Sequence, residues 1–251
     1  MMSMSHDSGP YQAWRTSLRL TGPDLAGGLL ATLAAALLNM WVLKLSGGYL
    51  VGVGALYVVL SVLVVASLPV SLGAAHLGAA NRVTLGRAAL VLPLAALTTQ
   101  GQVTSVIGYW WIIAVATVAM ILDCVDGWVA RRRGPTVFGA RFDMELDAFL
   151  LLVLSLMVWQ SGKVGPWVAL IGVLRYLFVA ASWLQSSLAV ELPPSWRRQT
   201  ICVVQGVVLL VCLGPVIPAT MASIIAFAAL VTLVTSFAVD VHWLSRSANG
   251  L

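Results

Sequence analysis

The stretch LDCVDGWVARRRGPTVFGARFDMELDAF, residues 122–149, holds five of the nine acidic residues in a chain of 251 residues. The rest of the chain is strongly apolar: 60% of all residues are hydrophobic and 9% are charged, whereas soluble domains carry about 25% charged residues. A carboxylate in the middle of a bilayer costs roughly 2.5–3.5 kcal/mol on insertion scales. We therefore expect this stretch to contain the functional site of an integral membrane protein.

Eight apolar spans predict an all-α, polytopic membrane protein with about eight transmembrane helices. Glycine, proline and polar clusters separate the spans. Two of them are shorter than the ~20 residues that a crossing needs, so their helices are expected to begin earlier, at Asn81 and Arg197. The spans are Leu25–Leu43, Leu50–Gly73, Leu85–Leu97, Ile107–Ala130, Ala140–Trp159, Val164–Leu184, Thr200–Leu213 and Ala219–Leu244.

The basic residues predict the orientation of these helices. With eight helices threaded, eleven arginines fall on one side of the membrane and only Lys44 and Lys163 on the other. The positive-inside rule then places both termini and the 131–141 loop in the cytoplasm. We expect a bacterial-type inner (plasma) membrane with the acidic stretch at its cytoplasmic face. The net charge of +5 is explained by the helix ends, so no nucleic-acid partner is expected.

The acidic residues form two pairs. Asp123 and Asp126 are three residues apart and share one face of a helix, and Asp143 and Asp147 are four apart and share one face of the next. A Gly-Pro turn at residues 134–135 would make these helices antiparallel neighbours, so four carboxylates converge. Such a group is relieved by protonation, by arginine or by divalent cations. Oxygen ligands favour magnesium, manganese or calcium over zinc, and magnesium usually also binds substrate phosphate, which indicates a two-metal site for phosphate transfer.

The complete pattern resembles the signature of the CDP-alcohol phosphotransferase (CDP-alcohol phosphatidyltransferase) family of integral membrane enzymes. It reads Asp123-x2-Asp126-Gly127-x2-Ala130-Arg131-x7-Gly139-x3-Asp143-x3-Asp147, and all eight signature residues match. Asn81-x2-Thr84-x2-Arg87 is similar to the start of the first core helix of that family. The organisation implied is a cytoplasmic N-terminal segment at 1–24, two extra transmembrane helices at 25–80 and a six-helix core at 81–251. The first segment is expected to be either a short interfacial helix or a flexible tail.

The resemblance also implies a reaction and the residues that perform it. A phosphatidyl-type group is transferred from a CDP-alcohol, with CDP-diacylglycerol preferred, to a small alcohol acceptor, and CMP is released. Two divalent cations, Mg²⁺ or Mn²⁺, are the implied cofactors, and membrane lipid and a homodimeric partner are compatible with the family. The implied metal ligands are Asp123, Asp126, Asp143 and Asp147, with Asp147 also the catalytic base, and the CDP-binding residues are Gly127, Ala130, Arg131, Gly139, Asn81 and Thr84.

Arginines outside the signature are candidates for binding a phosphate group on the acceptor. Arg175 lies inside an apolar span, where a charge is costly and therefore suggests a function. The candidates are Arg141, Arg175, Arg197 and Arg198; the last two equally suit topology anchors. Glu145 is expected to pair with Arg141 or to add a metal ligand. The alternative function is a cation or proton transporter, because buried carboxylates also mark ion pathways.

Overall fold

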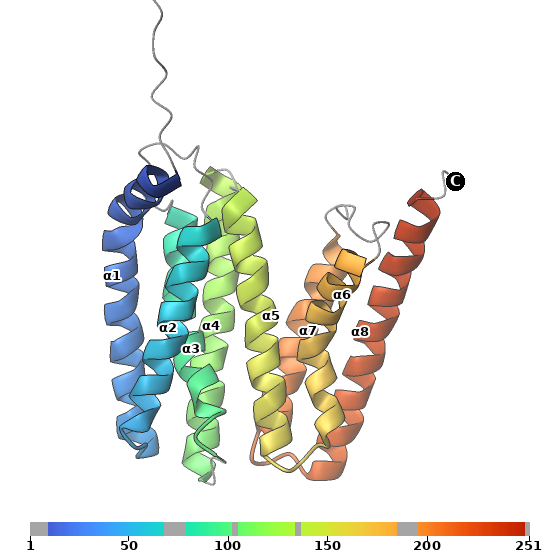
Figure 1. Cartoon of the computed structure of the whole chain (residues 1–251). Coiled ribbons are helices and arrows are strands. Elements are labelled where there is room, and N and C mark those ends of the chain that lie inside the picture. The colour runs from blue at the N-terminus through green and yellow to red at the C-terminus, as the bar shows by residue number, and fades with distance from the viewer. Residues whose placement is uncertain (1–9, 68–78, 102–104, 134–136, 185–194, 249–251) are drawn as a thin grey trace, which may run out of the picture. The chain divides into compact units, whose positions relative to one another are not determined.

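The computed structural model describes residues 10–67, 79–101, 105–133, 137–184 and 195–248, and every regular element in these residues is a helix (Figure 1). The eight α-helices in this part of the chain correspond to the eight expected spans, which confirms the all-α, polytopic prediction. In order they are α1 (Pro10–Leu43), α2 (Gly48–Ser67), α3 (Ala79–Leu97), α4 (Val106–Arg133), α5 (Val137–Gln160), the short 3₁₀ helix η1 (Pro166–Ala169), α6 (Leu170–Leu184), α7 (Trp196–Leu213) and α8 (Ala219–Ala248).

Five of these helices are long and apolar enough to cross a membrane: Thr21–Leu43 of α1, all of α2, Val106–Val125 of α4, all of α7 and Ala219–Leu244 of α8. The other three α-helices do not combine this length with this apolar character. Helices α3 and α5 carry charged residues within their first three turns, and α6 has only 15 residues. Large apolar side chains such as Val51, Ile107 and Ile224 are exposed, as expected for surfaces that face lipid.

Most helix boundaries differ from the expected spans by a few residues, and α1 and the sixth span differ more. Helix α1 is continuous from Pro10 to Leu43 and includes Pro23, so the segment ahead of the first span is helical from residue 10 onward. The expected span Val164–Leu184 is divided into η1 and α6. Pro166 has no N–H and a fixed φ, which suits the first turn of a helix, and η1 begins there. The turn expected at residues 134–135 lies outside the described residues.

The chain divides into two compact units: the described residues of Met1–Ala96 and Val118–Met144 form the first, and those of Leu97–Thr117 and Glu145–Leu251 the second. In the first unit, α1 and α2 pack side by side and are joined to α3. The fully buried hydroxyl of Tyr49 donates to the Pro93 carbonyl at 3.0 Å and accepts from the Asn39 amide at 3.1 Å. Polar bonds of this kind hold helices together where lipid supplies no hydrophobic driving force.

In the second unit, α7 packs along α8. The buried amide of Gln205 donates to the Ala229 carbonyl at 2.8 Å and so links the two helices. Lys163 follows the end of α5, and its ammonium donates to the Gly214 carbonyl at 2.5 Å. A cation at the carboxyl end of α7 satisfies carbonyls that have no partner within the helix and interacts favourably with the helix dipole.

A close helix contact in the second unit involves Gly172 of α6 and generates a prediction. A Cβ atom at Gly172 would lie 2.3 Å from the Cα atom of Leu152 in α5, so Gly172→Ala forces the backbones apart. We expect the free energy of unfolding to fall by about 1–3 kcal/mol, measured by thermal unfolding in detergent. Gly54→Ala in α2 is the control, because nothing lies within 4 Å of its added Cβ. Equal stability of the two variants would contradict the predicted close packing.

Candidate metal centre

Helix α4 is longer than its apolar span, so the first acidic pair, Asp123 and Asp126, lies at the edge of the apolar region. Helix α4 has 28 residues, or about 42 Å, whereas the hydrocarbon core is about 30 Å thick. Its apolar span ends at Val125, so Asp123 lies in the last apolar turn and Asp126 and Gly127 follow it. In α5 the second pair, Asp143 and Asp147, lies in the first three turns of the helix.

Three of the four signature carboxylates come together. One oxygen from each of Asp123, Asp143 and Asp147 lies within 4.8 Å of the others, and all three side chains are partly exposed. The fourth residue, Asp126, lies in α4, but its side chain is outside the described part of the structure. The 3.6-residue helix period therefore brings Asp143 and Asp147 to one face of α5, as the spacing predicted.

A buried arginine completes this cluster. Arg87 of α3 is fully buried, and its Nη1 lies 2.8 Å from Asp123 Oδ1 and 2.5 Å from Asp143 Oδ1. Its Nε donates to the Ala119 carbonyl at 3.3 Å. A buried guanidinium requires such partners, because an unpaired buried charge is very costly. In the sequence Arg87 follows Thr84 by three residues, but it is far from Asp123 and Asp143. Its pairing with these aspartates could therefore not be predicted from residue spacing.

Helix α3 presents the other two polar residues of its expected motif toward the interior. Asn81 and Thr84 are both buried and lie one helical turn apart on the face that also carries Arg87. Gly127 in α4 and Gly139 in α5 are partly exposed. Ala130 and Arg131 belong to α4, and their side chains are outside the described residues.

Two of the candidate acceptor residues are on exposed or partly exposed surfaces. Arg141 in α5 is exposed. Arg175 in α6 donates through Nη2 to Glu145 Oε1 at 2.6 Å, and their side chains are 29% and 52% exposed. Glu145 therefore pairs with a residue thirty positions away in the sequence. The Nε of Arg175 is buried and has no hydrogen-bond partner in the described part of the chain.

The other two candidates contact Asp240 of α8. The Nη2 of Arg197 lies 2.5 Å from Asp240 Oδ1, and its Nη1 donates to the Ser236 carbonyl at 2.9 Å and hydroxyl at 2.6 Å. The Nη1 of Arg198 lies 3.5 Å from the same Asp240 oxygen. Arg197 thus binds the start of α7 to α8.

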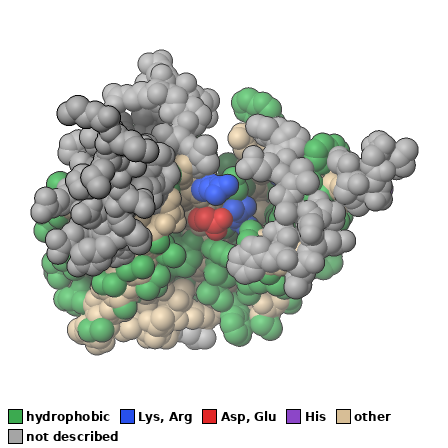
Figure 2. Space-filling model, turned by 45° about the horizontal axis from the view of Figure 1, so that its top comes forward, with side chains coloured by type: hydrophobic (Ala, Val, Ile, Leu, Met, Phe, Trp, Pro, Cys, Tyr) green, Lys and Arg blue, Asp and Glu red, His purple; other side chains and the backbone are tan. Residues whose placement is uncertain are grey.

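The donor set of the cluster fits a hard divalent cation. Carboxylate oxygens are the ligands that Mg²⁺ and Mn²⁺ prefer, and the partial exposure of Asp123, Asp143 and Asp147 leaves their oxygens accessible. Arg87 offsets part of their mutual repulsion. On the face shown in Figure 2 the described side chains are mainly hydrophobic, and the few charged ones lie together in one small area.

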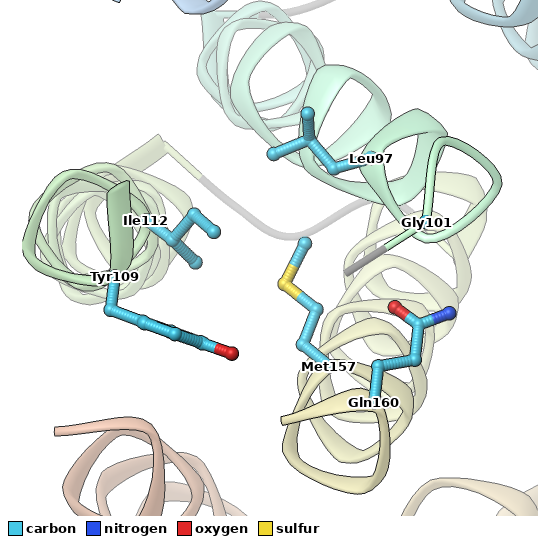
Figure 3. A pocket seen from close by; sticks show the side chains of 6 residues that line it. All are labelled: Leu97, Gly101, Tyr109, Ile112, Met157 and Gln160. Carbon is cyan, nitrogen blue, oxygen red and sulfur yellow. The ribbon is translucent and has the colours of Figure 1, made fainter. Parts of the chain in front are cut away.

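A small pocket lies near the opposite end of α5. It is lined by Leu97, Gly101, Tyr109, Ile112, Met157 and Gln160, and the hydroxyl end of Tyr109 points across it toward Met157 (Figure 3). Gln160 is the last residue of α5, about 25 Å along the helix from Asp143. The lining carries no charge, so this pocket is unsuited to an anionic nucleotide.

Comparison with known proteins assigns most of these helices to one family. A family model described as CDP-alcohol phosphatidyltransferase matches residues 77–238, from just before α3 to most of α8. Helices α1 and α2 lie outside the match. Neither the curated proteins nor the solved structures gave a match.

The arginine contacts at Asp240 generate a prediction about stability. Arg197 makes three hydrogen bonds to α8, whereas the contact between Arg198 and Asp240 is long at 3.5 Å, so Arg197→Met should lower the free energy of unfolding by about 1–3 kcal/mol. The matched variant Arg198→Met should lose less than about 1 kcal/mol. Thermal unfolding in detergent measures both. Equal losses would show that Arg197 has no special structural role.

Proposed function

Because this chain belongs to the CDP-alcohol phosphatidyltransferase family, we propose that it transfers a phosphatidyl-type group from CDP-diacylglycerol to a small alcohol and releases CMP. It is an integral membrane transferase. The observation that carries the proposal is the convergence of Asp123, Asp143 and Asp147 within 4.8 Å of one another inside the matched residues. Together with Asp126 they would hold two divalent cations, Mg²⁺ or Mn²⁺.

The proposed reaction is a displacement at phosphorus. When bound, the cations would neutralise the diphosphate of the donor and stabilise the departing CMP. Asp147 accepts the proton of the acceptor hydroxyl, and the hydroxyl oxygen forms a bond to the phosphorus that carries the alcohol. The bond from this phosphorus to the CMP oxygen breaks, which leaves a phosphodiester and CMP. Carboxylates mounted on helices suit this role because their positions are held rigidly.

We assign the cytidine diphosphate moiety to residues on three helices. Gly127 and Gly139 have no side chain and allow a nucleotide to approach the backbone of α4 and α5. Asn81 and Thr84 supply a buried amide and a buried hydroxyl on α3 as the polar groups for this assignment. Arg131, which follows Ala130 in the last turns of α4, is the proposed contact for a phosphate of this moiety.

The acceptor side of the proposal centres on Arg175. Its ion pair with Glu145 attaches it to α5 two residues before Asp147, the proposed base. Its buried, unpartnered Nε is a donor that an anionic acceptor would satisfy, which favours a phosphorylated alcohol. Arg141, Arg197 and Arg198 are the other proposed contacts. Of these, Arg197 is already bonded to Ser236 and Asp240, so its contribution to an acceptor would be the smallest.

We place the reaction at the cytoplasmic face of a bacterial-type inner membrane. The support is the excess of arginines on one side of the threaded helices, which includes the Arg131–Arg133 triplet at the end of α4. A transporter is the competing function, because carboxylates also mark ion pathways. The clustering of the acidic residues at one end of α4 and α5 favours the enzyme, since an ion pathway needs polar groups along the whole span.

The role of Asp147 is tested by Asp147→Asn. Purified protein with CDP-diacylglycerol, Mg²⁺ or Mn²⁺ and a panel of alcohols should release CMP, and Asp147→Asn should slow this release by about 10²–10⁴-fold while CDP still binds. Asp24→Asn is the control, because Asp24 pairs with Arg82, away from the cluster. Substantial activity of Asp147→Asn removes it as the base. Absence of CMP with every donor and acceptor, with metal-driven ion flux in liposomes, would support the transporter.

The role of Arg175 is tested by Arg175→Met. Loss of a charge-assisted hydrogen bond should raise the KM for a phosphorylated acceptor by about tenfold or more, and the KM for the CDP donor should change little. Steady-state kinetics with glycerol 3-phosphate and an uncharged alcohol separate the two effects. An equal rise in KM for both acceptors would exclude phosphate recognition by Arg175.

A further inference from the structure

The proposed reaction leaves Arg87 without a role, although this residue is the most deeply buried charge near the carboxylates. It contacts one oxygen of Asp123 and one of Asp143 through the same Nη1 atom. Both aspartates are proposed metal ligands. A cation bound by these two aspartates would therefore lie close to the positively charged guanidinium of Arg87, which already offsets part of their negative charge.

Arg87 is held at this position from two sides. Its Nε donates to the carbonyl of Ala119, one turn before Asp123 in α4, and its Nη1 contacts the carboxylates. It is fully buried, so leaving the cluster would move a charged group into apolar surroundings at high cost. Arg82, five residues earlier on α3, has a side chain that is 54% exposed and pairs with Asp24. Of these two arginines of α3, Arg87 is therefore buried and held in place, whereas Arg82 is largely exposed.

The charge of a fixed guanidinium has a defined effect on a divalent cation. Asp123 and Asp143 together carry two negative charges, and Arg87 offsets one of them. Repulsion between Arg87 and a cation bound by the same carboxylates is strong, because the charges are close and the guanidinium is fully buried. Arg87 also holds the two carboxylates in a fixed orientation, which favours cation binding. The positive charge of Arg87 therefore lowers the affinity for a cation, whereas its orienting effect on the carboxylates raises that affinity.

We propose that Arg87 is a positioning residue that aligns Asp123 and Asp143 and, through its fixed charge, keeps the affinity of the centre for divalent cations below that of the carboxylates alone. The inference rests on the proposed function, because it assumes that these aspartates hold cations. A purely structural arginine predicts the opposite result: its removal would disorder the carboxylates and weaken cation binding.

The test is a titration of the purified full-length protein in detergent with Mn²⁺, in which free Mn²⁺ is measured by electron paramagnetic resonance. Arg87→Met should lower the Kd for Mn²⁺ by about tenfold or more, because a unit charge beside a dication is removed. Arg87→Lys keeps the charge, so its Kd should stay within about threefold of the wild-type value. Arg82→Met is the matched control on the same helix, and its Kd should not change. An unchanged or raised Kd in Arg87→Met overturns the proposal.

Thermal unfolding provides a second measurement if Arg87→Met is unstable without metal. Tighter binding to the folded state must raise the melting temperature, so Mn²⁺ should increase the Tm of Arg87→Met more than that of the wild-type protein. A variant that stays unfolded in Mn²⁺ contradicts the inference.

If the wild-type protein binds no Mn²⁺, the proposed metal-dependent function fails. If it binds Mn²⁺ and releases CMP but Arg87→Met gains no affinity, only the inference about Arg87 fails.

Discussion

The repulsion between carboxylates placed at the edge of an apolar helix bundle is the constraint on which the candidate site depends. Asp123, Asp143 and Asp147 approach within 4.8 Å, a distance at which three negative charges destabilise the fold unless positive charge lies beside them. The protein supplies one such charge from within, through Arg87 of α3. The remaining excess of negative charge is what makes the cluster suited to cations and to the phosphate chemistry of its family.

The position of Arg87 depends in turn on how α3 is held. Tyr49 of α2 donates to the carbonyl of Pro93 in α3, and Asn39 of α1 donates to Tyr49. These contacts attach α1 and α2 to the helix that carries Asn81, Thr84 and Arg87. The two N-terminal helices therefore support a family motif that begins only at residue 77.

The sequence predicted the features that depend on local spacing. Apolar spans long enough for a bilayer indicated the helices, and the intervals of three and four residues placed each acidic pair on one helix face. Contacts between distant residues were not predictable in this way. Arg87 and Asp143 are 56 positions apart, and Glu145 pairs with Arg175 although Arg141 lies at helical spacing. Spacing identifies neighbours within a helix, but the packing of helices decides which charge is close to which.

The hydrogen bonds from Asn39 to Tyr49 and from Tyr49 to Pro93 bear on which helices contribute to the stability of the fold. A chain shortened to the residues that its family shares would lose both donors and leave a proline-containing stretch of α3 against lipid, where a bare carbonyl finds no water. Helices α1 and α2, which lie outside the family match, therefore belong to the same compact unit as α3 and help to hold it in place.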